Sequence, residues 1–226
     1  MSPSLGPATR LSAVLFDLDG TLVDTMQAFA DLAAEVMAAR HGLDHALARR
    51  RYLETSGLPF VHQLELIWPA HAANPAASAE FEARKLAVCR RTSMDERTVG
   101  ALEGLRALGL ALVVSSNTGQ DVVDEFAGRE RFRFDLALGF DPARGLAKGL
   151  PHVDRTLAAL GIARERLLFV GDSLRDADLA ELAGVPFVGR LGTFSADDFR
   201  RRDPDAVTVA HIDQLAGLLR AHLNPT

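Results

Sequence analysis

Five short apolar runs are the feature of this sequence that most constrains its fold. They occupy residues 13–16, 110–114, 134–138, 167–170 and 186–188, and runs of this length are typical of buried strands. Helical patterns fall between several of them, at residues 99–108, 153–160 and 176–183, and a glycine follows each helix as a natural stop. This alternation predicts an α/β fold, a Rossmann-like parallel sheet with helices on both faces.

One connection in this pattern is far too long to be an ordinary crossover. It spans residues 17–109, between the first two strands, and most of it has a helical pattern. Helices are expected at residues 26–37, after Pro59, and from about residue 74 to residue 91. Two pairs of residues are expected to open helices, Asp24 with Gln27 and Asn74 with Pro75. The sequence thus predicts a core domain, residues 10–23 and 96–226, interrupted by a helical domain, residues 24–95.

Composition excludes several classes of protein. The formal net charge of −5 argues against a general nucleic-acid binder, whose surface would be basic. No apolar run approaches the ~18 residues of a membrane span, and the opening residues lack the apolar segment of a signal peptide. Cys89 is the only cysteine, so a reducing, cytoplasmic location without an intrachain disulfide is expected. Both a monomer and a homodimer remain open.

Polar and charged residues gather where the predicted strands end. They are Asp17 and Asp19 after the first strand, Ser116 and Asn117 after the second, Lys148 before a later helix, and Asp172 and Asp176 after the fourth strand. Ligands of open parallel sheets bind beyond the carboxyl ends of the strands. We therefore expect these side chains to meet at one edge of the sheet.

Clustered carboxylates repel one another and lose hydration, and a hard divalent cation offsets both effects. Mg²⁺ prefers oxygen ligands and typically takes one or two carboxylates together with oxygens of a phosphorylated substrate. Asp17 and Asp172 suit that role. Ser116, Asn117 and Lys148 offer donors for the oxygens of an anion. The pattern predicts a phosphoryl-transfer site. The seven histidines show no ligand spacing, so we expect surface or partly buried side chains and no zinc site.

Four segments in this order, DLDGT, SSN, the lysine at 148 and GDSLRD, resemble the four motifs of the haloacid dehalogenase superfamily. The resemblance covers the whole chain, and the helical insertion directly after the first motif is similar to the C1 type of cap in that family. The overall pattern looks most like the phosphoglycolate-phosphatase-like hydrolases. What the resemblance implies is a Mg²⁺-dependent phosphatase with the HAD-like core fold.

The resemblance also implies roles for individual residues. Asp17 would attack phosphorus to form an aspartyl-phosphate, and Asp19 would serve as acid and then as base. Ser116, with Asn117, would bind a phosphoryl oxygen, and Lys148 would hold nucleophile and phosphate together. The implied metal ligands are Asp17, the Asp19 carbonyl, Asp172 and Asp176, with Asp176 either a ligand through water or an orienting residue.

Several alternatives stay open at this stage. In many relatives a proline directly follows the motif lysine, whereas here Gly149 follows it and Pro151 comes three residues after the lysine. The same core residues would serve a phosphomutase of the β-phosphoglucomutase type or, without catalysis, a binding protein of this fold. Asp176 could simply stabilise the first turn of a helix. Residues 54–60 are either a substrate-contacting loop or a helix–helix turn, and residues 200–205 are expected to form a solvated loop.

Overall fold

The computed structural model describes residues 10–223 and divides into two compact units. Among the described residues, 10–23 and 93–223 form the core unit, and Asp24–Thr92 form the helical unit. Met94 is buried in the apolar cluster of the core unit, which is why that unit resumes before residue 96. None of the helices described is long and apolar enough to cross a bilayer.

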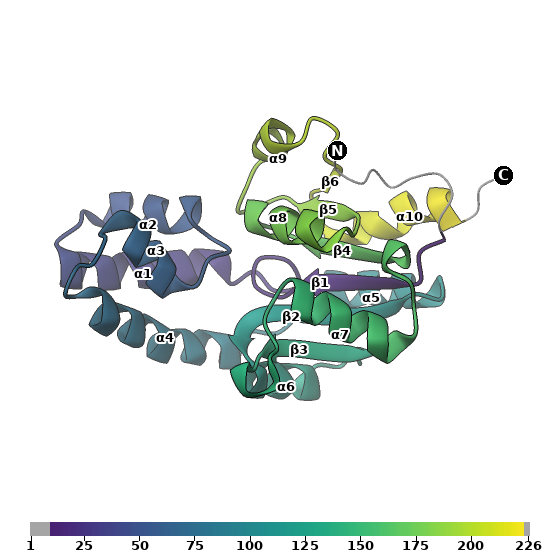
Figure 1. Ribbon diagram of the computed structural model, residues 1–226, viewed down its shortest axis with the longest axis horizontal. Helices are drawn as coiled ribbons and strands as arrows, with labels where there is room; N and C mark the ends of the chain where they lie inside the picture. Colours follow the sequence, from purple (N-terminus) through teal and green to yellow (C-terminus); the bar gives the residue numbers. More distant parts are fainter. Residues whose placement is uncertain (1–9, 224–226) are drawn as a thin grey trace. The chain divides into compact units, whose positions relative to one another are not determined.

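A parallel sheet forms the centre of the core unit (Figure 1). In spatial order, its six described strands are β3 (Leu136–Phe140), β2 (Ala111–Gly119), β1 (Ala13–Asp17), β4 (Leu167–Gly171), β5 (Phe187–Arg190) and β6 (Thr208–Val209). The predicted Rossmann-like α/β fold is confirmed. The sequence pattern missed β6, because a strand of two residues has no detectable alternation.

Helices cover both faces of this sheet (Figure 1). Those of the first face are α5 (Glu96–Ala107), α6 (Gln120–Arg129) and α10 (Leu215–Leu223); those of the second are α7 (Leu150–Leu160) and α8 (Leu174–Ala183). Val14 and Phe16 pack in the first layer, while Ala13 and Leu15 pack in the second, as the alternation of a strand requires. Because β1 is fully buried on both sides, it reads as a continuous apolar run.

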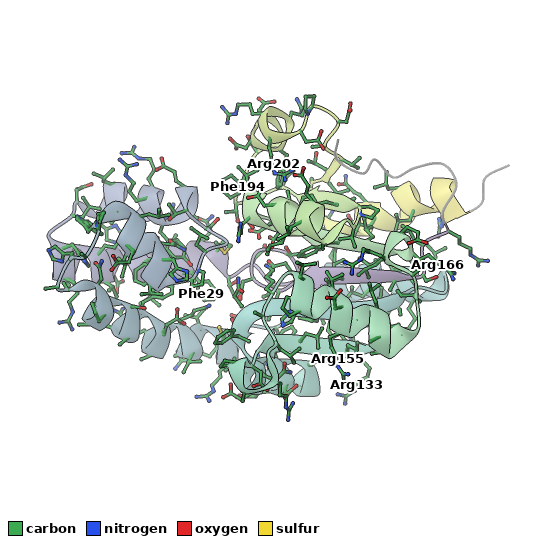
Figure 2. All side chains as sticks on the ribbon, in the orientation of Figure 1. Phe29, Arg133, Arg155, Arg166, Phe194 and Arg202 are labelled. Carbon is green, nitrogen blue, oxygen red and sulfur yellow. The ribbon has the colours of Figure 1, made fainter. Side chains whose placement is uncertain are left out.

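Short helices complete the core unit: α9 (Ala196–Arg202) and the 3-10 turns η1 (Pro142–Arg144), η2 (Arg164–Arg166) and η3 (Ile212–Gln214). The expected loop at residues 200–205 was therefore wrong for residues 200–202. Ser195 and Asp198 form a capping box that starts α9, and Arg202 binds Asp178 and Glu181 of α8 at 2.8 and 2.5 Å (Figure 2). The capping residues and these ion pairs explain why a charged segment is helical.

The helical unit contains α1 (Met26–His41), α2 (His45–Glu54), α3 (Phe60–Ile67) and α4 (Asn74–Arg91). Aromatic rings fill its interior. Phe29 (Figure 2) lies edge-on to Phe81 with ring centroids 6.4 Å apart, and Phe60 lies 4.2 Å from Phe81. Each such ring contributes roughly 1.5–3 kcal/mol through burial. The unit thus has an apolar core of its own.

Both predicted cap pairs were wrong. Helix α1 starts after Thr25, and no side chain caps it. Helix α4 starts after Ala73, so Asn74 is its first residue rather than its cap. The buried Asn74 amide instead donates to Glu65 Oε1 at 2.7 Å and to the Trp68 carbonyl at 2.8 Å. These tertiary hydrogen bonds outweigh the local capping preference of asparagine.

Candidate active site

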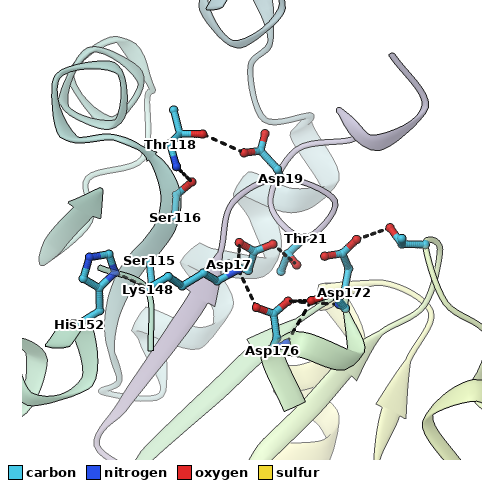
Figure 3. Close-up of polar contacts among 12 residues, drawn as sticks. Asp17, Asp19, Thr21, Ser115, Ser116, Thr118, Lys148, His152, Asp172 and Asp176 are labelled. Atoms are coloured by element: carbon cyan, nitrogen blue, oxygen red, sulfur yellow. Dashed lines mark hydrogen bonds and ion pairs between the residues drawn. The ribbon is translucent and has the colours of Figure 1, made fainter. Parts of the chain in front are cut away.

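Four of the expected side chains meet at the carboxyl ends of β1 and β4 (Figure 3). Asp17 is the last residue of β1, Asp172 directly follows β4, and Asp176 lies in the first turn of α8. Lys148 precedes α7, and its Nζ lies 2.5 Å from Asp17 Oδ1 and 2.6 Å from Asp176 Oδ1. The Lys148 side chain is only 5% exposed, so its charge is compensated inside the protein rather than by water.

Three buried carboxylates share this single ammonium group. Burial raises the pKa of Asp17 to about 7; Lys148 opposes this shift, while Asp176 and Asp19 add to it. Burial, with the charges of Asp17 and Asp176, also raises the pKa of Asp172 well above its usual value. Burial by itself would lower the pKa of Lys148, but the two adjacent carboxylates outweigh it and raise that pKa. The cluster is therefore short of positive charge.

This donor set fits a hard divalent cation. Asp17, Asp172 and Asp176 each offer a carboxylate oxygen, and these oxygens lie within 4.8 Å of one another. Asp172 Oδ2 also accepts a hydrogen bond from Thr193. Asp176 is held differently: Oδ2 accepts from the Ser173 hydroxyl at 2.7 Å, and Oδ1 faces Lys148. The capping box of α8 and the contact with the lysine thus use the same carboxylate.

A tight turn directly follows Asp19. Gly20 has a φ of 87°, which glycine adopts without strain, and its N–H donates to the Val23 carbonyl. The turn directs the Thr21 hydroxyl back to Asp17 Oδ2 at 3.3 Å. Asp19, half-buried, accepts a hydrogen bond from the Thr118 hydroxyl at 3.3 Å (Figure 3). Asp17 and Asp19, only two positions apart in the sequence, thus have carboxylates in different surroundings.

The end of β2 carries the expected serine and asparagine, and the strand runs five residues further than predicted, to Gly119. Ser116 is buried and its Oγ accepts a hydrogen bond from the Thr118 N–H at 3.0 Å, while Asn117 is exposed. Thr118 was not among the predicted site residues. The sequence feature that could have identified Thr118 is its position, two residues after Ser116 at the end of the same strand.

His152 contradicts the expectation that the histidines are surface or partly buried groups. It is fully buried at the start of α7, with Nδ1 2.9 Å from Ser115 Oγ (Figure 3). Its Nε2 lies 3.0 Å from the Gly139 carbonyl. Burial lowers the pKa of His152 to about 4; the hydrogen bond to Gly139 opposes the shift and the nearby Lys148 charge adds to it. Its signal in the sequence was its place four residues after Lys148 and before the buried Val153.

The glycine that replaces the usual proline after the lysine has a structural reason. Gly149 has φ 106° and ψ −138°, a conformation that proline cannot adopt and other residues rarely do. A Cβ at this position would lie 2.8 Å from Leu179 Cδ2. Pro151 instead occupies the first turn of α7, where proline is tolerated.

Residues 14–190 match the profile of haloacid dehalogenase-like hydrolases. The chain belongs to this family. It is 27% identical over 223 residues to a phosphoglycolate phosphatase of Cereibacter sphaeroides, covering 93% of this chain and 98% of that one. A phosphoglycolate phosphatase of Salmonella typhi is 26% identical over 245 residues, covering 94% of each chain.

Two solved structures share the fold of this hydrolase. A hydrolase from Pseudomonas syringae has a TM-score of 0.73 at 18% identity, covering 92% of this chain and 97% of that one. CbbY from Rhodobacter sphaeroides, solved in complex with phosphate, has a TM-score of 0.65 at 20% identity, covering 91% and 96%. Within the fold, the cluster of this hydrolase lies at the ends of the adjacent central strands β1 and β4.

Proposed function

We propose that this hydrolase is a Mg²⁺-dependent phosphatase that cleaves a small phosphomonoester through an aspartyl-phosphate on Asp17. The observation that carries the proposal is the contact of the Lys148 ammonium group with both Asp17 and Asp176, inside a buried cluster that also contains Asp172. A buried carboxylate beside a lysine, at the carboxyl end of a parallel strand, is suited to meet a phosphoryl group. The similarity to phosphoglycolate phosphatases supports the same reaction.

In the first step an Asp17 oxygen forms a bond to phosphorus while the bond from phosphorus to the ester oxygen breaks. The leaving oxygen takes the proton of Asp19 and departs as an alcohol. Lys148 and the Thr21 hydroxyl contact different oxygens of Asp17 and so fix the orientation of the nucleophile.

In the second step Asp19, now ionised, takes a proton from water as the water oxygen attacks phosphorus. The bond from phosphorus to Asp17 breaks, and inorganic phosphate is released. The Thr118 hydroxyl, which donates to Asp19 Oδ2, holds the acid–base group in one place through both steps. The net reaction consumes one water and returns both aspartates to their starting forms.

Asp17 and Asp172 would hold the Mg²⁺ ion, with the Asp19 carbonyl as a further ligand. Because burial and neighbouring carboxylates raise the pKa of Asp17, this nucleophile needs more positive charge than Lys148 alone supplies to stay ionised. When bound, the cation supplies that charge and neutralises the phosphoryl oxygens. Asp176 Oδ2 accepts from Ser173, whereas Oδ1 pairs in charge with Lys148 at 2.6 Å but has no hydrogen-bond partner among the described residues, so Asp176 would orient Lys148 and could complete the metal site through a water.

Ser116 and Asn117 would bind the phosphoryl oxygens. The Ser116 oxygen accepts the Thr118 N–H, which leaves the hydroxyl proton available to donate to an anion. Asn117 follows at the exposed end of the strand, where its amide can reach a ligand. Two neutral donors and one lysine suit a dianion without the help of further basic side chains.

Phosphate release tests the proposal. Phosphoglycolate is the first substrate to assay, with p-nitrophenyl phosphate as a general ester, each with Mg²⁺ and with a chelator. We expect release only with the metal, and a loss of at least about 10³-fold in Asp17→Asn. The matched control is Asp197→Asn, which changes an exposed carboxylate of α9 in the same unit. Full activity in Asp17→Asn, or equal release in the chelator, would contradict the proposal.

A further inference from the structure

A fully buried histidine joins three separate segments beside the catalytic cluster. His152 lies on α7, Ser115 lies on β2, and Gly139 lies on the edge strand β3. The Gly139 carbonyl can only accept a hydrogen bond, so His152 Nε2 must carry the proton and donate it across 3.0 Å. His152 Nδ1 is then an acceptor, and it takes the Ser115 hydroxyl proton across 2.9 Å. Both ring nitrogens of one neutral tautomer are thereby used.

These hydrogen bonds connect two parts of the proposed site. Ser115 pairs with Asp17 in the register of β1 and β2, and Ser116 is the next residue along β2. His152 lies in the first turn of the helix that directly follows Lys148 and Gly149. The imidazole therefore ties the lysine segment to the strand end that carries the Ser116 hydroxyl.

We propose that His152 is a positioning residue that sets the Ser116 hydroxyl in line with Asp17 and Lys148 by holding the hydroxyl of Ser115. This inference rests on the proposed function, since it assigns to Ser116 the binding of a phosphoryl oxygen. His152 itself touches no substrate. It acts through its hydrogen bond to Ser115, and through the position of Ser116 it sets the affinity of the site for phosphate.

Two amide substitutions separate the two hydrogen bonds of the ring. In His152→Asn the side-chain oxygen can occupy roughly the place of Nδ1 and accept from Ser115. In His152→Gln the amide nitrogen can reach roughly the place of Nε2 and donate to Gly139, while the Ser115 bond is lost. Ser115→Ala removes the same bond from the other side with little change in volume. The matched control is Thr156→Val, because the buried Thr156 hydroxyl donates to the His152 carbonyl at 2.8 Å, away from Ser115.

The measurement is the affinity for inorganic phosphate with Mg²⁺ present, followed through the NMR amide shifts of Ser116 and Thr118, together with KM and kcat for phosphoglycolate. We expect Kd and KM to rise about tenfold in His152→Gln and Ser115→Ala, with a smaller change in kcat. In His152→Asn, Kd and KM should remain within about threefold of the wild-type values. If His152 only filled space in the core, the smaller asparagine would not retain this affinity better than glutamine. Thr156→Val should lose stability yet keep its phosphate affinity.

The outcomes distinguish the two proposals. If the wild type binds phosphate but releases none from any ester, the phosphatase proposal fails, and the variant affinities still decide the role of His152. The inference is overturned if Ser115→Ala binds phosphate as tightly as the wild type, if His152→Asn is no better than His152→Gln, or if the wild type binds no phosphate. If the His152 variants do not fold, the phosphate affinity of Ser115→Ala tests the proposal instead. In addition, the ¹⁵N chemical shifts of the wild-type His152 ring must show a protonated Nε2 and an unprotonated Nδ1.

Discussion

Lys148 is the residue on which the charge balance of the cluster depends. Replacing it by methionine would leave Asp17 and Asp176 buried without their cation. Removing one partner of a buried ion pair costs roughly 3–5 kcal/mol, so we expect Lys148→Met to lower the free energy of unfolding by about that amount in the absence of Mg²⁺. Urea denaturation measures this loss, and phosphate release from phosphoglycolate should fall at least about 100-fold.

The chain has one other lysine, and it provides the control. Lys85 lies in the helical unit, with its ammonium group 5.1 Å from the centre of the Phe29 ring. Such a contact is worth about 0.5–1 kcal/mol when exposed, so Lys85→Met should change stability little. Equal destabilisation by the two substitutions would mean that Lys148 does not hold buried carboxylates.

His152 predicts a dependence of stability on pH. Its pKa is lowered from 6.5 to about 4 on folding, so the unfolded chain binds more protons between these values. The contribution of His152 is therefore complete above pH 6.5 and is lost as the pH falls towards 4, by about 3 kcal/mol at most. The raised pKa values of Asp17 and Asp172 act in the opposite sense, so the comparison must be made with a variant.

His152→Asn provides that comparison. Urea denaturation of both proteins across pH 4 to 7 should give a difference in unfolding free energy that shrinks on acidification, because the variant lacks the group that titrates. A difference that stays constant across this range would show that His152 has an ordinary pKa in the folded protein.

At the scale of the elements, the turn between Lys148 and α7 depends on one glycine. Gly149→Ala would place a methyl group 2.8 Å from Leu179 Cδ2, in a backbone conformation that alanine avoids. We expect a loss of about 1–3 kcal/mol in unfolding free energy and a lower kcat, because the turn carries the lysine. Gly100→Ala, in α5 with open space around it, should be neutral or stabilising by up to about 1 kcal/mol. Similar effects of both substitutions would mean that the turn is not strained.

The elements that could be predicted from the sequence are those that bury a face. β1 is an apolar run that ends in Asp17, and β4 is an apolar run that Asp172 directly follows, so the sequence pattern predicted where both carboxylates lie. Contacts between distant segments could not be predicted in this way. The place of Asn74 against Glu65, and that of His152 against Ser115, depend on tertiary packing that no local pattern encodes. Short elements such as β6 were not predicted, because a strand of two residues has no periodicity to detect.

For the whole molecule, the order of the sheet explains why residues so far apart in sequence form one cluster. After β1 the chain forms the helical unit, and it then returns through α5 to form β2, which pairs with β1. Later, β4 pairs with the other edge of β1. Asp17 thus lies on a central strand between the serine-bearing and aspartate-bearing neighbours. The alternation of strands and helices made this arrangement predictable, whereas the conformation of the turns that present the side chains was not.

A cation held by residues from two of these strands should stabilise the folded chain as a whole. Binding at 100 times Kd adds about 2.7 kcal/mol, so Mg²⁺ should raise the melting temperature of the wild type by several degrees. Asp172→Asn should abolish this rise, since it removes the ligand from β4 without changing its size. Asp178→Asn, an exposed residue of α8, should keep it. Calorimetry with Mg²⁺ and with a chelator measures both, and a rise retained in Asp172→Asn would place the cation at another set of ligands.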